Sequence, residues 1–503
     1  MSGAVESTVG KRHGKERDHD GDAVVSVHAT SDAPVIFNRI DRVVEHVTCL
    51  GCGCACDDIR VTVSTQDRGE RIVAAVNACA MGAGWFGDGV VPGRAGIGGA
   101  DEVPVPGPDL ATGTMLDSAL DAIARLLTHA RRPMVYLAPD LSCEAQRAGV
   151  ALADSLRGVL DSVTSATTLG GVLAAQERGT ATATLGEVRN RADLVLYWGV
   201  DPSTRYPRYV ERYAPDAPGV FLPEGRRSRR VVDVAVAVDV GTARGPVDAD
   251  VRFAIEPEME VAVMTALTAV LNEAVLNAAV LHAAVLNAAS PPSTADAGAV
   301  WAIARALAPV LLGARYVAIV VDAEPTAAVP DGRPGPATLR HSARIALAHA
   351  LNGVVRCGVS TLRAGGNRTG ADAVTVAQTG FPCAVDFGRG FPRYDPHAGS
   401  AESRLDRGEI DAVLVLGSAA GLPAAVRARL AGVPVAVVGP RASASGLATH
   451  GYVDTGVAGI HEAGTALRMD DVPLPLTAVL DGPARAAEVV QALIDRVRRA
   501  GSV

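Results

Sequence analysis

The sequence is poor in aromatic residues: Phe, Trp and Tyr make up 4% of its 503 residues, although hydrophobic residues as a whole make up 48%. We therefore expect its cores to be built from small aliphatic side chains. No segment reaches the roughly 20 uninterrupted apolar residues that a membrane-spanning helix needs. A basic surface is missing too, because the net charge is −8. This argues against nucleic acid or an anionic membrane as a partner.

The cysteines are also not distributed as in a protein held together by disulfides. Five of the eight cysteines lie between residues 49 and 79, a distribution typical of a metal site. This favours a reducing, cytoplasmic environment. Residues 1–34 alternate charges and contain no apolar core segment, so we expect a disordered extension and no signal peptide.

Four of these cysteines have the spacing of an iron-sulfur site. Cys49, Cys52 and Cys56 form a C-x2-C-x3-C pattern in a Gly-rich stretch, and Cys79 follows them. A tight turn must aim three sulfurs at one cube while a fourth arrives from the next loop. We therefore predict a [4Fe-4S] cluster on Cys49, Cys52, Cys56 and Cys79, with Cys54 outside the ligand set. A tetrahedral zinc site and a set of buried free thiols are the alternatives.

Most of the chain alternates between apolar strand-like and helix-like segments. Strands are expected at 59–63, 72–76, 133–138, 193–198, 316–321, 354–359, 412–416 and 433–438, and helices at 143–156, 337–351 and 422–430. This alternation predicts an α/β fold in which helices cover both faces of parallel sheets. A near-perfect pentapeptide repeat at 269–288 interrupts it and is interpreted as a low-complexity expansion.

The length of the chain predicts several packed units. The predicted segments are a disordered extension (1–34), an N-terminal Cys-rich lobe (35–110), an α/β domain (111–255), an α/β domain with a helical low-complexity insert at 269–289 (256–410) and a C-terminal α/β segment (411–503).

Five separated motifs resemble one family, the B subunit of formylmethanofuran dehydrogenase, a branch of the molybdopterin oxidoreductases. The motifs are TCLGCGCACDDI (48–59), LYWGVDP (196–202) with YPR (206–208), GGNRTGA (365–371), QTGFPCAVDFGRGFPRY (378–394) and GTALRMD (464–470). The resemblance implies a small N-terminal cluster-type lobe and doubly wound parallel-sheet domains. Working enzymes of this family reduce CO2 on a tungsten or molybdenum pterin.

The metal of that family is ligated by a cysteine with a histidine beside it. The corresponding stretch here is DSVTSATTLGGVLAAQERG (161–179), in which the resemblance places Thr167 and Thr168 at the two positions. A hydroxyl is not a soft anionic donor, so Thr167 cannot replace a thiolate on tungsten or molybdenum. Cys143 lies too early in the chain to substitute. We therefore expect the tungsten or molybdenum pterin to be absent.

A chain that keeps the family's scaffold but lacks its metal ligands resembles the B subunit of the formyltransferase/hydrolase complex of methylotrophic bacteria. The resemblance implies three partners: a hydrolase-like A subunit, a C subunit and a formyltransferase. That complex moves a formyl group from tetrahydromethanopterin to a methanofuran analogue and hydrolyses it to formate, without a redox step. The alternative is a redox-active B subunit of formylmethanofuran dehydrogenase that interconverts CO2 and formyl-methanofuran. A free-standing nucleotide-binding protein is disfavoured, because no G-x-G-x-x-G follows a strand.

Two further expectations concern single motifs. The glycines of residues 365–370 predict a loop that opens into a central cleft, with Arg363 beside it, or else only a tight structural turn. The run 378–394 concentrates aromatic and Arg residues in an aromatic-poor chain, which favours an interface with partner subunits or a wall of the substrate cleft.

Overall fold

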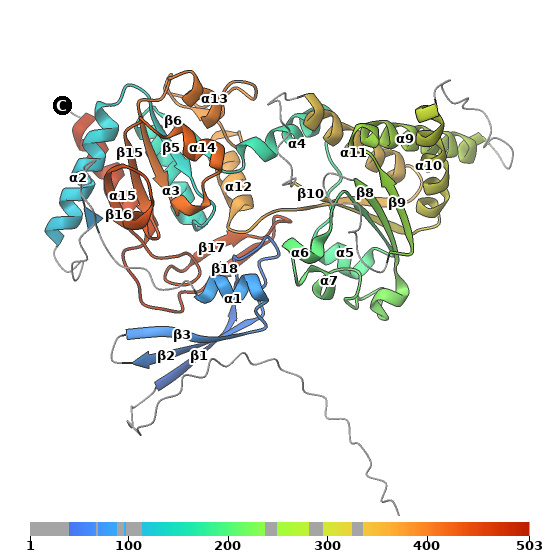
Figure 1. The fold of residues 1–503 in the computed structure, drawn as a ribbon, viewed down its shortest axis with the longest axis horizontal. Helices are drawn as coiled ribbons and strands as arrows, with labels where there is room; N and C mark the ends of the chain where they lie inside the picture. Colours follow the sequence, from blue (N-terminus) through green and yellow to red (C-terminus); the bar gives the residue numbers. More distant parts are fainter. Residues whose placement is uncertain are drawn as a thin grey trace, which may run out of the picture. The chain divides into compact units, whose positions relative to one another are not determined.

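The computed structural model describes residues 40–66, 69–87, 95–96, 113–236, 249–280, 295–323 and 335–501. The predicted extension 1–34 and the later part of the pentapeptide repeat lie outside these ranges. The described chain combines parallel sheets with helices on both of their faces (Figure 1), which confirms the predicted α/β fold class. None of the described helices has the length and apolar character required to cross a membrane.

A three-stranded antiparallel sheet opens the described chain. Its strands are β1 (Ile40–Val47), β2 (Ile59–Gln66) and β3 (Gly69–Val76), in the order β1-β2-β3. The antiparallel pairing of β2 with β3 joins the strands expected at 59–63 and 72–76 in one hairpin. Helix α1 (Ala80–Gly87) begins directly after Cys79. The cysteine-rich loop connects β1 to β2, and the Cys49 backbone N–H closes it by donating to the Cys56 carbonyl at 2.9 Å.

The five-stranded sheet is parallel throughout, in the order β11-β10-β7-β8-β9. Its strands are β7 (Leu194–Trp198), β8 (Arg230–Val236), β9 (Val251–Ile255), β10 (Tyr316–Asp322) and β11 (Arg356–Leu362). Three long helices cover one face: α9 (Glu260–Val280), α10 (Ala295–Leu312) and α11 (Gly335–Asn352). The shorter α5 (Leu185–Arg191), α6 (Pro202–Arg205) and α7 (Tyr209–Arg212) lie on the other side.

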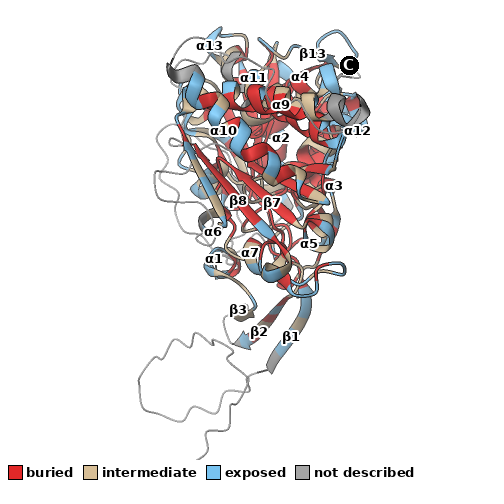
Figure 2. Cartoon of the chain, turned by 90° about the vertical axis from the view of Figure 1, so that its right-hand side faces the viewer, coloured by how far each residue is buried: buried red, intermediate tan, exposed pale blue. Residues whose placement is uncertain are grey.

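Strand β7 explains why this sheet is covered on both faces. Leu196 and Trp198 belong to the cluster under α9, α10 and α11, whereas Val195 and Tyr197 pack with residues of α5 and α7. Because successive strand residues point to opposite faces, an uninterrupted apolar strand requires helices on both. Figure 2 shows β7 and most of β8 as buried ribbons.

The second large sheet has eight strands, in the order β13-β12-β6-β5-β14-β15-β16-β4. Its members are β4 (Ala95–Gly96), β5 (Pro133–Leu137), β6 (Val159–Ser162), β12 (Val385–Asp386), β13 (Arg393–Tyr394), β14 (Ala412–Leu416), β15 (Val435–Gly439) and β16 (Thr449–Asp454). The central five strands are parallel, and the strands at both edges join them in antiparallel fashion.

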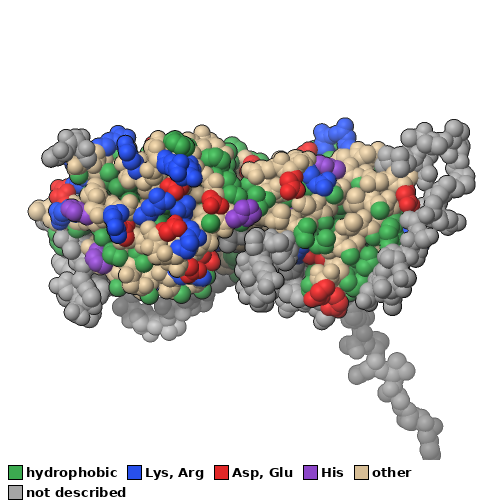
Figure 3. Space-filling model, turned by 90° about the horizontal axis from the view of Figure 1, so that it is seen from above, with side chains coloured by type: hydrophobic (Ala, Val, Ile, Leu, Met, Phe, Trp, Pro, Cys, Tyr) green, Lys and Arg blue, Asp and Glu red, His purple; other side chains and the backbone are tan. Residues whose placement is uncertain are grey.

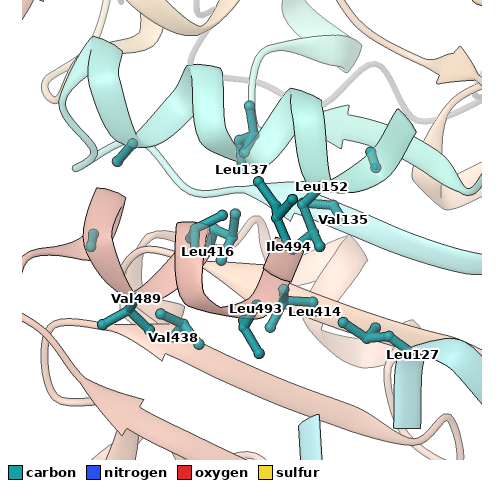
Figure 4. Packing of buried hydrophobic residues seen from close by; sticks show 14 of the residues in the cluster. Leu127, Val135, Leu137, Leu152, Leu414, Leu416, Val438, Val489, Leu493 and Ile494 are labelled. Carbon is teal, nitrogen blue, oxygen red and sulfur yellow. The ribbon is translucent and has the colours of Figure 1, made fainter. Parts of the chain in front are cut away.

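Helices again cover both faces of this sheet. Helices α2 (Gly113–His129), α3 (Cys143–Ser155), α12 (Arg368–Thr379) and α15 (Ala486–Gly501) contribute to one core, and α13 (Ala401–Asp406) and α14 (Ala424–Arg429) to the other. Figure 4 shows Leu137 and Leu416 of the strands meeting Leu152 of α3 and Ile494 of α15. Each buried leucine side chain contributes about 1.5–3 kcal/mol relative to an exposed one.

The two large sheets are interleaved along the sequence. The eight-stranded sheet takes β5 and β6 before the five-stranded sheet begins and β14 to β16 after it ends. The domain boundaries proposed from the sequence stay a prediction. Helix α4 (Ser165–Arg178) follows β6 and packs against α11 of the other sheet.

The remaining elements are short. Strands β17 (Gly464–Leu467) and β18 (Pro473–Leu476) pair antiparallel. Single 3-10 turns are η1 (Gly225–Ser228), η2 (Pro257–Met259), η3 (Ala419–Gly421) and η4 (Ala442–Ala444).

Candidate functional site

The four predicted cluster cysteines lie together. Cys49, Cys52 and Cys56 are buried in the β1–β2 loop, and Cys79 stands between β3 and α1. The Gly51 backbone N–H donates to the Cys49 sulfur at 3.3 Å. A Cβ on Gly82 would lie 3.3 Å from the Cys49 sulfur and 4.0 Å from that of Cys79. A glycine thus lies against both sulfurs, leaving room that a larger residue would fill.

The electrostatics of these thiols reflect burial and their closeness to one another. Burial raises the pKa of Cys49 to about 12, and the neighbouring Cys52, Cys56 and Cys79 add to the rise. Burial also raises the pKa of Cys56, to about 11, against the opposing charges of Arg212 and Arg208. Several thiolates packed together without metal repel each other. The donor set therefore fits a metal cluster, which would carry the compensating positive charge.

Cys54 differs from the other four cysteines. Its thiol hydrogen-bonds the Cys52 thiol, an interaction that lowers the pKa of Cys52 to about 7 and raises that of Cys54. Within the described ranges, no three or more His, Cys, Asp or Glu side chains are arranged to hold a metal ion. Four cluster sulfurs bind four different irons, so they are spaced more widely than the ligands of one ion. The cluster assignment stays a prediction.

Two arginines secure the cysteine loop from the side of the five-stranded sheet. The Arg208 guanidinium donates to both carboxylate oxygens of Asp58, at 2.7 and 2.9 Å. Arg212 donates to Asp57 at 2.8 Å and also pairs with Asp58. A bidentate guanidinium–carboxylate pair has a fixed geometry. It ties the end of the CACDD stretch to α7, so two of the motifs found in the sequence contact each other.

The glycine motif 365–370 forms the connection from β11 to α12 and packs against the cysteine loop. The Gly366 backbone N–H donates to the Leu50 carbonyl at 2.8 Å. A Cβ on Gly365 would lie 2.4 Å from the Gly51 carbonyl oxygen, and one on Gly53 only 2.1 Å from the Arg363 carbonyl oxygen. These distances match the structural interpretation of the motif, because only glycine allows two backbones to approach so closely.

Thr167 and Thr168 lie in the first turn of α4. The Thr167 hydroxyl donates to the Thr164 carbonyl at 3.1 Å. The Thr168 hydroxyl donates to Asp372 at 3.4 Å and accepts from Arg363 at 3.2 Å. Both hydroxyls are therefore engaged within the protein, and neither is a soft ligand.

An ion pair occupies the space beside Thr168. Arg363 and Asp372 approach to 2.8 Å, and their side chains are only 11% and 14% exposed. The Thr164 hydroxyl donates to the other oxygen of Asp372 at 2.5 Å. The three positions come from β6–α4, from the end of β11 and from α12. The structure thus brings Arg363 to Thr168, next to Thr167 in the chain, but Arg363 is already paired with Asp372. We call these four residues the threonine site.

Asp372 and Cys383 are site residues that sequence reasoning missed. Cys383 is buried, and burial raises the pKa of its thiol, with Asp161 and Asp372 adding to the rise. Its thiol hydrogen-bonds Ser165, the first residue of α4, so it lies near the end of the helix that carries Thr167 and Thr168. The only sequence signal was its place in the 378–394 motif. Burial likewise raises the pKa of Asp161 to about 6, against hydrogen bonds from backbone amides.

The run 378–394 divides into inward and outward side chains. Phe387 is buried, and Phe381 stacks on Tyr394 with ring centroids 5.2 Å apart. Phe391, in contrast, is 55% exposed. An aromatic interface anchor in this run is therefore limited to Phe391.

Comparison with known proteins gives matches over nearly the whole chain, although no protein-family model matches. The B subunit of tungsten-containing formylmethanofuran dehydrogenase 2 from Methanocaldococcus jannaschii is 29% identical over 467 residues, 91% of this chain and 99% of the relative. The protein with the same name from Methanococcus maripaludis is 27% identical over 469 residues, with the same coverage. This chain resembles the formylmethanofuran dehydrogenase B subunit. The resemblance drawn from the five motifs is thus confirmed.

A solved structure shares the fold of this chain. A chain in the crystal structure of the formyltransferase/hydrolase complex from Methylorubrum extorquens, determined with methylofuran, superposes with a TM-score of 0.61. The match covers 82% of this chain and 100% of that chain at 22% identity. At this identity the match shows the fold.

The buried ion pair generates a stability prediction. Asp372→Asn leaves the Arg363 guanidinium without its counter-charge, so we expect a loss of about 3 kcal/mol in the free energy of unfolding. Asp406→Asn, which removes the partner of Arg429 at the surface, should leave the stability unchanged. Denaturant unfolding of the two variants checks this, and equal stabilities would contradict it.

Proposed function

We propose that this chain is the B subunit of a formyltransferase/hydrolase complex in tetrahydromethanopterin-linked one-carbon metabolism, on the route from formaldehyde to formate. In this proposal it is a scaffold and carries out no redox step. The observation that carries the proposal is the threonine site. The sequence resemblance assigns Thr167 and Thr168 to the positions of the family's cysteine and histidine, and an Arg363–Asp372 ion pair lies beside Thr168.

The proposed partners are a hydrolase-like A subunit, a C subunit and a formyltransferase. Support comes from two sides. The curated relatives are named as subunits of an enzyme, and the solved structural neighbour is a chain of a formyltransferase/hydrolase complex.

One observation favours the alternative, a redox-active B subunit of formylmethanofuran dehydrogenase. Cys383 is a buried thiol whose pKa responds to the charges of Asp372 and Arg363, and a thiolate is the ligand that tungsten or molybdenum requires. This cysteine comes from the loop after α12, whereas the family's cysteine stands at the position of Thr167. The two functions therefore differ in a measurable metal content.

The scaffold proposal predicts that the complex purified from its native host contains far less than one tungsten or molybdenum atom per chain. Elemental analysis measures this directly. Cys383→Ser should then leave the metal content unchanged. Stoichiometric tungsten or molybdenum that is lost in Cys383→Ser would overturn the scaffold role and establish the alternative.

We further propose that Cys49, Cys52, Cys56 and Cys79 hold a [4Fe-4S] cluster. When bound, such a group cross-links the chain segments that supply its sulfurs and can also carry an electron. In a scaffold its role is the cross-link, which joins the β1–β2 loop to the segment between β3 and α1.

The cluster proposal predicts about four iron atoms per chain in protein purified without oxygen, with the broad visible absorbance of an iron-sulfur cluster. Cys49→Ala should remove most of this iron. Cys54→Ala, in the same loop, should retain it, because Cys54 is outside the ligand set. Wild-type protein free of iron, or equal iron loss in both variants, would refute the assignment.

The partner interface is proposed to include Phe391. Exposed aromatic residues are frequent anchors of protein interfaces, and a good anchor contributes about 2 kcal/mol or more. Phe391→Ala is therefore expected to weaken binding of the partner subunits roughly 30-fold, while the chain stays folded because this side chain is largely exposed.

The matched control is Phe221→Ala, since Phe221 is 61% exposed on a different part of the chain. Co-purification and analytical ultracentrifugation of the co-expressed complex measure the outcome. The interface assignment fails if Phe391→Ala leaves assembly intact, or if both variants weaken it equally.

A further inference from the structure

A charged pocket lies on the edge of the eight-stranded sheet, and none of its lining residues belongs to the cysteine loop or to the group Thr167, Thr168, Arg363 and Asp372. Its volume is about 480 Å³, within the roughly 300–1,000 Å³ range of small-ligand pockets. Residues from the start of β5, from β12 and β13, and from α13 and the turn after it form its walls. On the face seen in Figure 3, Lys and Arg side chains gather with Asp and Glu side chains over the part of the chain that contains this sheet.

The pocket carries more positive than negative groups. Its charged lining consists of four guanidinium groups and three carboxylates, from Arg132, Arg393, Arg404, Arg407, Asp386, Asp395 and Glu409. Arginine stays protonated. The pKa of Asp395 is lowered by hydrogen bonds from backbone amides, and that of Glu409 by a hydrogen bond from Arg407. One positive charge therefore remains at neutral pH.

The carboxylates already have partners inside the protein. The Asp386 carboxylate accepts hydrogen bonds from the Arg132 guanidinium at 2.5 Å and from the Arg404 guanidinium at 3.4 Å. Burial raises the pKa of Asp386, but the Gly388 amide and these arginines outweigh burial, so the pKa is lowered. The Glu409 carboxylate accepts hydrogen bonds from the Arg404 guanidinium at 3.1 Å and from the Arg407 guanidinium at 2.6 Å. These pairs hold the walls of the pocket in place. Asp395, the third carboxylate, accepts the backbone N–H groups of His397 and Ala398 at 3.0 Å each.

Arg393 is the one lining arginine for which the described residues provide no ion pair. It lies opposite Asp386 in the β12–β13 pairing, so both side chains stand on the same face of the sheet. Asp386 is already shared by Arg132 and Arg404, and Arg393 makes no side-chain hydrogen bond or ion pair with any residue that the structure describes. Its guanidinium offers five N–H donors in a planar fork that fits carboxylate or phosphate.

Tyr394 supplies a second feature of the pocket wall. Its phenol oxygen is buried and has no hydrogen-bond partner among the described residues. Burial raises the pKa of this phenol, so it stays protonated and can donate. Because this oxygen is buried, Tyr394 forms part of the pocket wall, and its hydroxyl is not counted as a contact for a ligand in the pocket.

We propose that this pocket binds a small molecule through a carboxylate or phosphate group, with Arg393 as the principal contact. The proposal does not depend on the scaffold function, because the isolated full-length chain contains the whole pocket.

The test is isothermal titration of the full-length chain with inorganic phosphate and with succinate, at low and constant ionic strength because salt screens exposed charges. We expect one molecule bound per chain. The anion that binds more tightly shows whether the natural ligand carries a phosphate or a carboxylate group. Arg393→Gln should weaken binding about tenfold or more, since it removes a charge-assisted hydrogen bond. Arg393→Lys should retain part of the affinity because it keeps the charge.

Arg389→Gln is the matched control. Arg389 is exposed in the same run and also makes no ion pair with described residues, but it does not line the pocket. It should bind both anions like the wild type. Failure of the wild type to bind either anion, or an equal loss in Arg389→Gln and Arg393→Gln, would overturn the proposal. Thermal unfolding of each variant shows whether the fold is retained.

Discussion

The close backbone contact at residues 365–367 is the constraint on which the arrangement of the described chain depends. The Gly366 amide donates to Leu50 of the cysteine loop, and the next amide, of Asn367, donates to Pro139 after β5 at 2.5 Å. The buried Asn367 side chain also accepts from the Leu467 amide at 2.8 Å. One short loop at the end of β11 therefore joins the five-stranded sheet to the cysteine loop and the eight-stranded sheet through backbone atoms, and to β17 through the Asn367 side chain.

The same loop determines what fills the threonine site. Arg363 stands at its start, where the chain leaves β11, and this places its guanidinium against Asp372 and Thr168. A buried cation without a partner is costly, whereas a neutralised and hydrogen-bonded pair is tolerated. The space next to Thr168 is thus closed by groups that satisfy each other.

Much of the fold follows from sequence pattern, and the interior of the site does not. Uninterrupted apolar strands such as β7 and β14 require two covered faces, so the doubly wound arrangement could be predicted. Short edge strands such as β12 and β13 were missed because two residues carry no periodic signal. The proximity of the four cysteines follows from their spacing and from one hairpin. The meeting of Arg363, Asp372 and Cys383 with α4 depends on three-dimensional packing between segments some 200 residues apart, which no local pattern encodes.

Side-chain direction in the run 378–394 is the last feature that pattern could not supply, and it separates two roles that the sequence merges. Phe387 and Tyr394 point into packed surroundings, while Phe391 and Arg393 stay exposed. An inward aromatic residue stabilises the edge of the sheet, and an outward one is available to a partner or ligand. Under the proposed scaffold role, with an ion pair beside the interior threonine site, the chain acts through its surface. The edge formed by β12, β13 and α13 combines an exposed aromatic ring, a spare guanidinium and a polar pocket, so binding rather than internal chemistry is the activity to seek there.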